Sequence, residues 1–366
     1  MLVYYLLLVG SLAIGIPLCR LKHGKKIYCG LAGAALFLVA AFREGVGFDY
    51  YPYTTWFYET TWRSEYELMG YGQEKGFLIP VKFLADATGN HQIMFVVIAA
   101  VITAAVMIYI YFYTEKAYIS VFCFLAFGVF FNSMCFMRQM IAAAILLFAI
   151  RYIKKKQFFR FLALVLFASA FHISALVMVV FYFLLQVKMN WISFGVYSGA
   201  LVLFLFFSEA AIEFVTQYFY TGYQLGAHPE ITIGIGPVYA VFFGILFLLA
   251  FAVRKRLCEK DKFNNVFINI MFFVFFFEVM GAKHAVLSRF AGVFIIPAAI
   301  VLVPKVIEAY TELCREKFGK DRRKLIISQT AVLTAFAAFS TFVYSYMLVD
   351  NYNGVVPYQT VFTERG

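Results

Sequence analysis

The sequence predicts an all-helical protein that crosses a membrane many times. Hydrophobic residues make up 63% of the 366 residues, charged residues make up only 14%, and the mean hydropathy is +0.82. Soluble domains contain far more charged residues, about a quarter of the total. Apolar stretches recur from residue 1 to residue 346 with no polar block long enough to form a second core. We therefore expect a single integral membrane domain over residues 1–366.

The first apolar run, residues 1–19, resembles a secretory signal peptide. Basic residues follow this run, however, and no small-residue cleavage site closes it. We therefore interpret residues 1–19 as the first membrane span.

Most of the 31 lysines and arginines lie in short loops between apolar stretches. Under the positive-inside rule such loops face the cytoplasm. The net charge of +11 is then a signal of topology and does not indicate a nucleic-acid-binding surface. The basic loops are residues 20–26, 114–117, 151–160, 188–190, 254–262 and 305–324.

The apolar stretch between two cytoplasmic loops must cross the membrane twice, which predicts about twelve spans with both termini outside. Residues 158–187 then form a hairpin with arms of about 15 residues. Such arms are about 22 Å long, shorter than the roughly 30 Å hydrocarbon core, so the turn near His172 should lie below the outer surface. The same reasoning predicts turns between Asn132 and Arg138 and near Arg289. Polar turns at that depth require an outward-facing polar cavity.

Two longer external segments, residues 43–91 and 208–235, are rich in tyrosine and tryptophan. We expect them to form interfacial helices over this cavity. The six cysteines form no C-x-x-C pair, so the sequence indicates neither a disulfide framework nor a metal site, and it suggests no cofactor.

Three arginines lie at the external ends of apolar runs, the disfavoured side for positive charge: Arg43, Arg138 and Arg289. A guanidinium binds phosphate through paired, charge-assisted donors, and the interaction strengthens where water is scarce. Each arginine alone could instead reach the outer headgroups or pair with a local carboxylate such as Glu44. Together the three predict a diphosphate-binding site.

Two external carboxylates and one histidine are candidate catalytic residues. Asp49 and Glu74 lie nearest to membrane entry points, where a partly desolvated carboxylate gains basicity. As alternatives, Asp49 stabilises a turn with Gly47, and Glu74 pairs with a neighbouring lysine. His172 is an ionisable group in an apolar hairpin, which makes it either a functional residue or a hydrogen-bonded packing residue.

Candidate sugar-binding residues are neutral or aromatic. Gln139 and Ser174 each follow a candidate charged residue closely, and they could bond sugar hydroxyls or, equally, backbone carbonyls across helices. Tyr50 and Tyr53 could stack on sugar rings, although aromatic belts at the membrane interface are the more common explanation for external tyrosines.

Five short motifs run in order through residues 43–290: Arg43-x-x-x-Gly47-x-Asp49-Tyr50-x-x-Tyr53, Glu74-Lys75-Gly76-Phe77, Arg138-Gln139-x-x-Ala142, Phe171-His172-x-Ser174-Ala175 and Ser288-Arg289-Phe290. Together they resemble the EpsG family of bacterial polysaccharide polymerases, which are related in role to Wzy-type polymerases of O-antigen and capsule. The resemblance implies a GT-C-like fold in the bacterial plasma membrane, an active site on the extracytoplasmic face, and undecaprenyl-diphosphate-linked repeat units as substrates. It also implies a flippase and a chain-length regulator as partners.

On this resemblance, a hydroxyl of one lipid-linked repeat attacks the anomeric carbon of the growing glycan, and the diphosphate leaves. The three arginines would neutralise the charge that develops on the leaving group. The mechanism needs no metal, which agrees with a sequence that has no D-x-D motif and no Cys/His ligand cluster. Asp49 is the first candidate for the base, followed by Glu74 and His172.

Three other classes share these features. A transporter or flippase of lipid-linked saccharides should show repeated halves and a path open to both faces. The sequence shows neither an internal repeat nor comparable intramembrane charge near the cytoplasmic ends. An acyltransferase would take its acyl donor from the cytoplasm, whereas the candidate ligands lie at external ends. A glycan ligase, or a glycosyltransferase with a monophosphate-linked donor, shares nearly all of these features, and the sequence leaves this alternative open.

Overall fold

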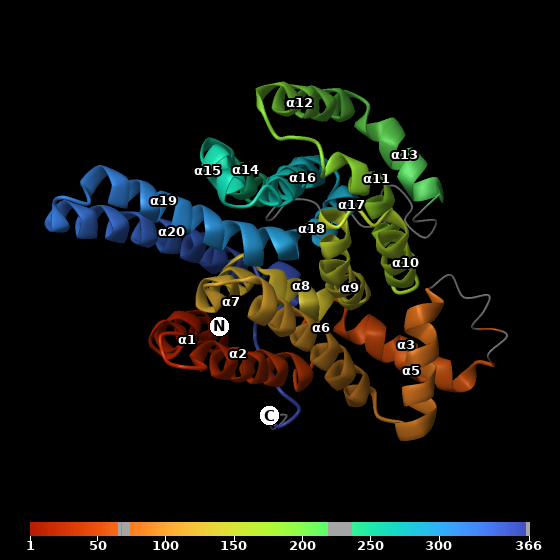
Figure 1. Ribbon diagram of the computed structural model, residues 1–366. Coiled ribbons are helices and arrows are strands. Elements are labelled where there is room, and N and C mark those ends of the chain that lie inside the picture. Colours follow the sequence, from red (N-terminus) through yellow and green to blue (C-terminus); the bar gives the residue numbers. More distant parts are fainter. Residues whose placement is uncertain (65–66, 68–73, 219–235, 364–366) are drawn as a thin grey trace. The chain divides into compact units, whose positions relative to one another are not determined.

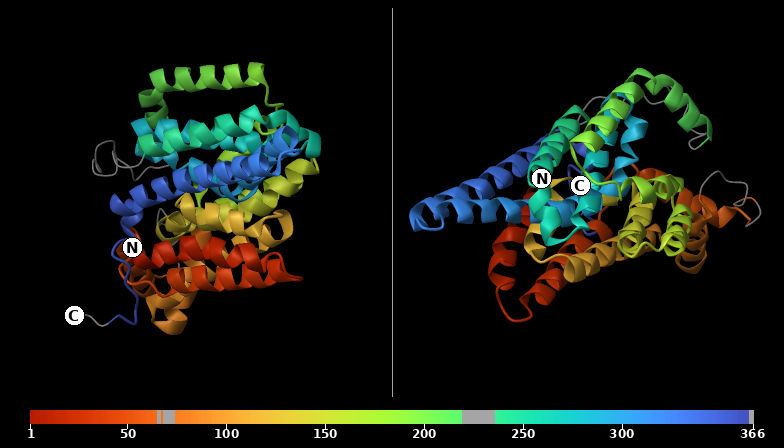
Figure 2. Two further views of the ribbon diagram at one scale, coloured as in Figure 1. Left: turned by 90° about the vertical axis from the view of Figure 1, so that its left-hand side faces the viewer. Right: turned by 45° about the horizontal axis from the view of Figure 1, so that its top comes forward.

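The computed structural model describes residues 1–64, 67, 74–218 and 236–363. Within these residues every regular element is helical, apart from an isolated bridge between Arg43 and Thr360, so the prediction of an all-helical protein is confirmed. Figures 1 and 2 show the helices coloured along the sequence. The helices divide into two compact units. Unit 1 contains residues 1–176 and 344–366, and unit 2 contains residues 177–343.

Unit 1 is built around the long apolar helix α6, which packs against α2, α5 and α9. Helix α9 packs in turn against α10 (Figure 1). The Asn90 side chain caps α6 by accepting the Gln92 N–H at 3.0 Å, and Gly89 (φ 61°) ends the preceding helix α5. The helices of unit 1 are α1 (Leu2–Leu18), α2 (Gly24–Ala41), α3 (Tyr50–Trp62), α5 (Lys75–Thr88), α6 (His91–Tyr113), α7 (Ala117–Ala126), α8 (Val129–Cys135), α9 (Met137–Lys154), α10 (Phe158–Ser169), the short η1 (Ile173–Val177), which ends in unit 2, and the short η4 (Tyr352–Gly354).

Two predicted turns are present in unit 1. The chain bends by 57° between α7 and α8, where Gly128 takes a positive φ of 67°, and it turns again at Phe136 between α8 and α9. The second expected turn, near His172, lies between α10 and η1. Asn132 and Arg138 flank the first turn, and His172 lies at the second, as the sequence predicts.

The C-terminal segment 350–363 wraps around the loop 43–49, a contact that the sequence did not predict. The N–H of Gly47 donates to Gly354 O at 2.9 Å, and the N–H of Phe48 donates to Asn353 O at 2.9 Å. The buried Asn353 side chain donates to Asn132 Oδ1 of α8 at 2.8 Å. The loop between α2 and α3 is thus fixed by both the end of the chain and α8.

Unit 2 has a phenylalanine-rich core centred on α16, which packs against α14, α17 and α18. Phe181 contacts Phe273 with ring centroids 4.6 Å apart and Phe294 at 4.8 Å. The helices of unit 2 are α11 (Met178–Leu184), α12 (Trp191–Phe206), α13 (Ser208–Tyr218), α14 (Gly236–Ala252), α15 (Arg254–Lys260), α16 (Asn264–Lys283), α17 (Ala285–Ser288), α18 (Ala291–Pro297), η3 (Ala298–Leu302), α19 (Val303–Phe318) and α20 (Arg322–Val349), which ends in unit 1.

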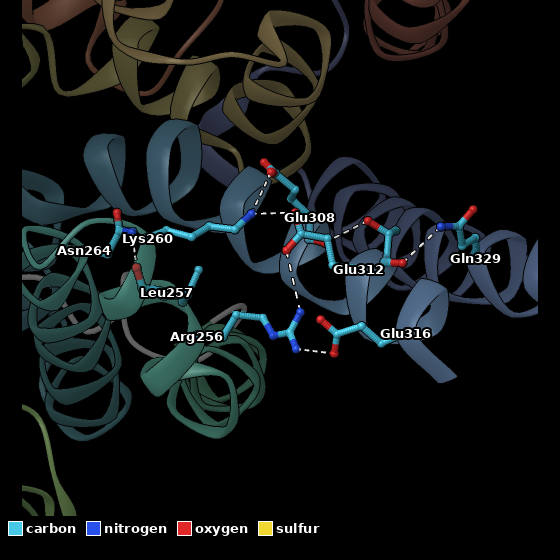
Figure 3. A network of polar contacts seen from close by, with 9 residues as sticks. Arg256, Leu257, Lys260, Asn264, Glu308, Glu312, Glu316 and Gln329 are labelled. Carbon is cyan, nitrogen blue, oxygen red and sulfur yellow. Dashed lines mark hydrogen bonds and ion pairs between the residues drawn. The ribbon is translucent and has the colours of Figure 1, made fainter. Parts of the chain in front are cut away.

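A charged network joins two of the predicted cytoplasmic loops within unit 2 (Figure 3). Arg256 of α15 pairs with Glu316 of α19 at 2.5 Å, and Lys260 pairs with Glu312 at 2.5 Å and with Glu308 at 3.0 Å. Part of the positive charge of the loop 254–262 is therefore balanced by acidic residues of α19.

The number of spans differs from the prediction. Five helices are long and apolar enough to cross a membrane, and the number rises to seven if each of two bent helix pairs forms one span. About twelve full-length spans are therefore not found in the described part of the chain. The reason is length, because several apolar segments form helices of only 10–17 residues, including both arms of the hairpin 158–187. The five helices are Gly24–Ala41, His91–Tyr113, Asn264–Lys283, Ala291–Phe318 and Arg322–Val349, and they make the chain a multi-pass membrane protein.

A candidate active site in unit 1

Arg138 lies in the first turn of α9, directly after the turn at Phe136. This turn rests on Arg43, whose Nη2 donates to Met134 O at 2.9 Å and contacts Met137 Sδ at 3.2 Å. Arg43 is only 1% exposed, and its other guanidinium nitrogens donate to the carbonyls of Ala40 and Val46. Burial lowers the pKa of Arg43 to about 10, so the group stays charged at neutral pH. Arg43 therefore supports the segment that presents Arg138.

Glu74 is the N-cap residue of α5, and Gly76 fixes its position. The N–H of Gly76 donates to Ala170 O at 2.9 Å, in the turn that follows α10. A Cβ atom at position 76 would lie 2.5 Å from that oxygen, so only glycine permits this close approach. The contact brings the start of α5 against the turn that carries His172.

Glu74 joins Arg138 and His172 in one cluster. Its Oε2 accepts from Arg138 Nη1 in an ion pair, and its Oε1 contacts His172 Nδ1 at 2.9 Å and accepts the Ile173 N–H at 3.1 Å. The side chains of Arg138, Glu74 and His172 are 18%, 16% and 8% exposed. The cluster is thus mostly buried, with a small part of Arg138 and Glu74 exposed.

The surroundings of Glu74 keep its carboxylate ionised. Burial alone would raise the pKa of Glu74, but the hydrogen bond from His172 and the charges of Arg138 and His172 outweigh it and lower the pKa to about 2. A carboxylate with so low a pKa accepts a proton poorly at neutral pH. Glu74 is therefore suited to hold Arg138 and His172 in place.

An aromatic wall formed by Tyr53 and Trp56 of α3 covers one side of Arg138. The guanidinium lies 5.0 Å from the Trp56 ring centroid, and the main-chain N–H of Arg138 donates to the Tyr53 hydroxyl at 3.4 Å. The two rings pack edge to face at 5.2 Å. Sequence reasoning missed Trp56, although its i, i+3 spacing from Tyr53 places both residues on one helix face.

Asp49 lies beside this wall as the half-buried N-cap residue of α3. Burial raises the pKa of the Tyr53 hydroxyl, the charge of Arg138 opposes this effect, and the charge of Asp49 adds to it. Asp49 is therefore close enough to Tyr53 for its charge to act on the hydroxyl that also contacts Arg138.

The neutral candidates occupy different places. Gln139 and Ser174 are buried next to Arg138 and His172, respectively. The Ser174 hydroxyl has no hydrogen-bond partner among the residues that the structure describes. Tyr50 lies outside the cluster, because it stacks on Phe95 at 4.6 Å.

Arg289 belongs to unit 2, where it is half-buried in the break between α17 and α18. The structure thus brings one of the three candidate arginines, Arg138, into the cluster of unit 1. In the described residues no group of three or more His, Cys, Asp or Glu side chains is arranged to hold a metal ion.

Comparison with known proteins gives one match. No curated protein and no solved structure matches the chain. The sequence matches the EpsG family over residues 26–360, which is nearly the whole chain. Membership of this family implies a role in polysaccharide biosynthesis. This multi-pass membrane protein therefore belongs to the EpsG family.

Proposed function

We propose that the protein polymerises polyprenyl-diphosphate-linked oligosaccharide repeats by glycosyl transfer at the extracytoplasmic face of the plasma membrane. The observation that carries this proposal is the cluster of Arg138, Glu74 and His172, which combines an anion-binding group with an oriented imidazole. These are the two functions that a transfer from a diphosphate-linked donor to a sugar hydroxyl requires.

His172 acts as the general base in this proposal. Its Nδ1 faces Glu74 Oε1 at 2.9 Å, so a proton on Nδ1 leaves the lone pair on Nε2. A carboxylate that holds an imidazole in this way selects the tautomer and stabilises the imidazolium that forms. In this proposal His172 replaces Asp49, the first candidate for the base, and Glu74 is a positioning residue.

In the reaction, the acceptor hydroxyl loses its proton to His172 Nε2, and its oxygen bonds to the anomeric carbon of the donor. The bond between that carbon and the diphosphate oxygen breaks, and the diphosphate leaves with the electron pair. Arg138 stabilises the negative charge on this leaving group. Trp56 and Tyr53 form an aromatic surface beside Arg138 on which a sugar ring can stack.

The location of the cluster supports an extracytoplasmic site. Arg138 is at the start of α9 and His172 follows the end of α10, whereas the basic loop 151–160 joins the opposite ends of these two packed helices. Because the basic loop is expected in the cytoplasm, the cluster is expected on the other side.

The proposal is tested with the purified full-length protein in lipid vesicles and a defined undecaprenyl-diphosphate repeat unit, with products separated on a gel. We expect a ladder spaced by one repeat for the wild type and for His23→Gln, a matched control at an exposed histidine. His172→Gln should slow formation of the ladder about 100-fold or more while the protein remains folded by size-exclusion chromatography. Transfer of a single finished glycan to another acceptor would indicate a ligase instead, and movement of the lipid-linked unit across the vesicle without a new bond would indicate a transporter.

A further inference from the structure

A partly open apolar cavity of about 150 Å³ lies in unit 2 near the end of α16. Met280 and Leu287, which form two of its walls, are 1% and 2% exposed, so the cavity reaches into the core of the unit. The cavity is lined by Val177, Phe204, Phe277, Met280, Leu287 and Phe290.

The size and chemistry of this cavity suit a small hydrocarbon group. An apolar cavity of about 150 Å³ walled by aliphatic and aromatic side chains stays dry and binds a six-carbon ring such as benzene. One isoprene unit contains five carbons and carries a methyl branch, so it is wider than a straight acyl chain. Rings on more than one wall could contact both of its faces, and Phe204, Phe277 and Phe290 all line the cavity.

Two basic residues lie close in sequence to residues that line the cavity. Leu287 and Phe290 are lining residues, and Arg289 lies between them in the chain. Lys283, at the end of α16, donates to Ser208 Oγ at 2.6 Å and to Leu205 O at 3.2 Å. Arg289 is therefore the candidate partner for the anionic head of a ligand whose apolar chain occupies the cavity.

The cavity is also at the depth where a lipid head begins. Helix α16 contains 20 residues, which gives a length of about 30 Å, equal to the hydrocarbon core of a bilayer. The charged network of Arg256 and Lys260 lies at its start, and the cavity lies near its end. With the basic network in the cytoplasm, the cavity is near the outer headgroup level.

We propose that this cavity binds the isoprene unit next to the diphosphate of a polyprenyl diphosphate carrier, and that Arg289 binds the diphosphate. The inference rests on the proposed function, which requires such a carrier, and it assigns unit 2 a binding site of its own. The site recognises both parts of the ligand, so neither the head nor the chain alone should bind as well as the two joined.

The test is photo-crosslinking of the full-length protein in lipid nanodiscs with a farnesyl diphosphate that carries a diazirine on its first isoprene unit. We expect the label in α12, α16 and the segment 287–290, with competition by undecaprenyl diphosphate. Inorganic diphosphate and farnesol should each compete poorly. Labelling elsewhere, or equal competition by phosphatidylglycerol, would show a general lipid surface and overturn the proposal.

Two variants fill the cavity from different walls, so the test does not depend on one of them folding. Leu287→Phe and Met280→Phe should each weaken binding about tenfold, because the larger side chain displaces part of the ligand, equivalent to one or two buried methylene groups, from the cavity. Leu203→Phe, at a 61% exposed position of α12, is the matched control and should bind normally. Normal affinity in both cavity variants would refute the site.

The binding assay needs no turnover, so the two proposals can fail separately. Specific labelling by a protein that makes no polymer would preserve the carrier site and remove the polymerase. Polymer formation without labelling of unit 2 would remove the carrier site alone.

Discussion

Replacing Glu74 with glutamine tests the electrostatics of the cluster, because the change keeps the shape of the side chain and removes its charge. The pKa of Glu74 falls from 4.5 to about 2 in the folded protein. Since each pKa unit corresponds to about 1.4 kcal/mol, the charged interactions of Glu74 contribute about 3 kcal/mol to the free energy of unfolding at neutral pH. Glu74→Gln should lose most of this contribution.

The pH dependence of this loss in stability shows whether the loss is electrostatic. A group whose pKa is lower in the folded state stabilises the protein above its unfolded pKa, and this stability is lost as the pH falls through the folded pKa. The difference in the free energy of unfolding between wild type and Glu74→Gln should thus be constant above a pH of about 5. It should shrink by more than half by about pH 3 and vanish below about pH 2.

The measurement is a denaturant titration in detergent micelles, read by tryptophan fluorescence, for which Trp56 beside Arg138 is a local probe. Glu115→Gln, at an exposed carboxylate, is the control and should match the wild type within about 0.5 kcal/mol. A difference for Glu74→Gln that stays the same between pH 7 and pH 3 would refute the electrostatic explanation.

Three further predictions concern neighbouring residues. Arg138→Lys keeps the charge but loses the planar fork, so the initial rate of polymerisation should fall about 100-fold at normal protein level. Arg160→Lys, at an exposed site, is the control and should keep the wild-type rate. A wild-type rate for Arg138→Lys on the gel would remove Arg138 from the site. Asn353→Ala leaves Asn132 Oδ1 without its donor and should lower the free energy of unfolding by about 2 kcal/mol, and an unchanged thermal midpoint would contradict the role given to the C-terminal segment. Arg43→Met removes donors from three carbonyls and should destabilise the protein by about 3 kcal/mol, and a stable but inactive variant would instead make Arg43 a substrate ligand.

The helical turns could be predicted from the distribution of charge. The requirement that basic loops stay on one side, together with the short arms of the hairpin 158–187, predicted a turn near His172, and the structure has one between α10 and η1. The turn before Arg138 follows from the same reasoning. These features depend on local sequence, so local sequence was sufficient.

The predicted number of spans exceeds the five to seven that helix length and composition support in the described residues, because the charge rule counts crossings and does not consider helix length. Several apolar segments satisfy the rule but form helices of 10–17 residues. A helix of that length rises at most about 26 Å, which is less than a bilayer core. Composition therefore identified the class of protein, while helix length decides which segments can span.

The pairing of the candidate residues could not be predicted, because it depends on contacts between distant parts of the chain. Arg43, like Arg138, is predicted at the external end of an apolar run, yet it is buried against main-chain carbonyls. Trp56 joins the site only because α3 packs beside the start of α9. Glu74 meets His172 through a contact between Gly76 and Ala170 that spans more than 90 residues of sequence.

The most direct test of the proposed site is the initial rate of the first glycosidic bond between two lipid-linked repeats, measured for Glu74→Gln, His172→Gln and the double variant. If Glu74 acts by holding His172, the double variant should be no slower than His172→Gln alone, because residues that work as a unit are not additive. Fully additive losses would show that Glu74 and His172 act independently, and a wild-type rate in His172→Gln would contradict the proposed site.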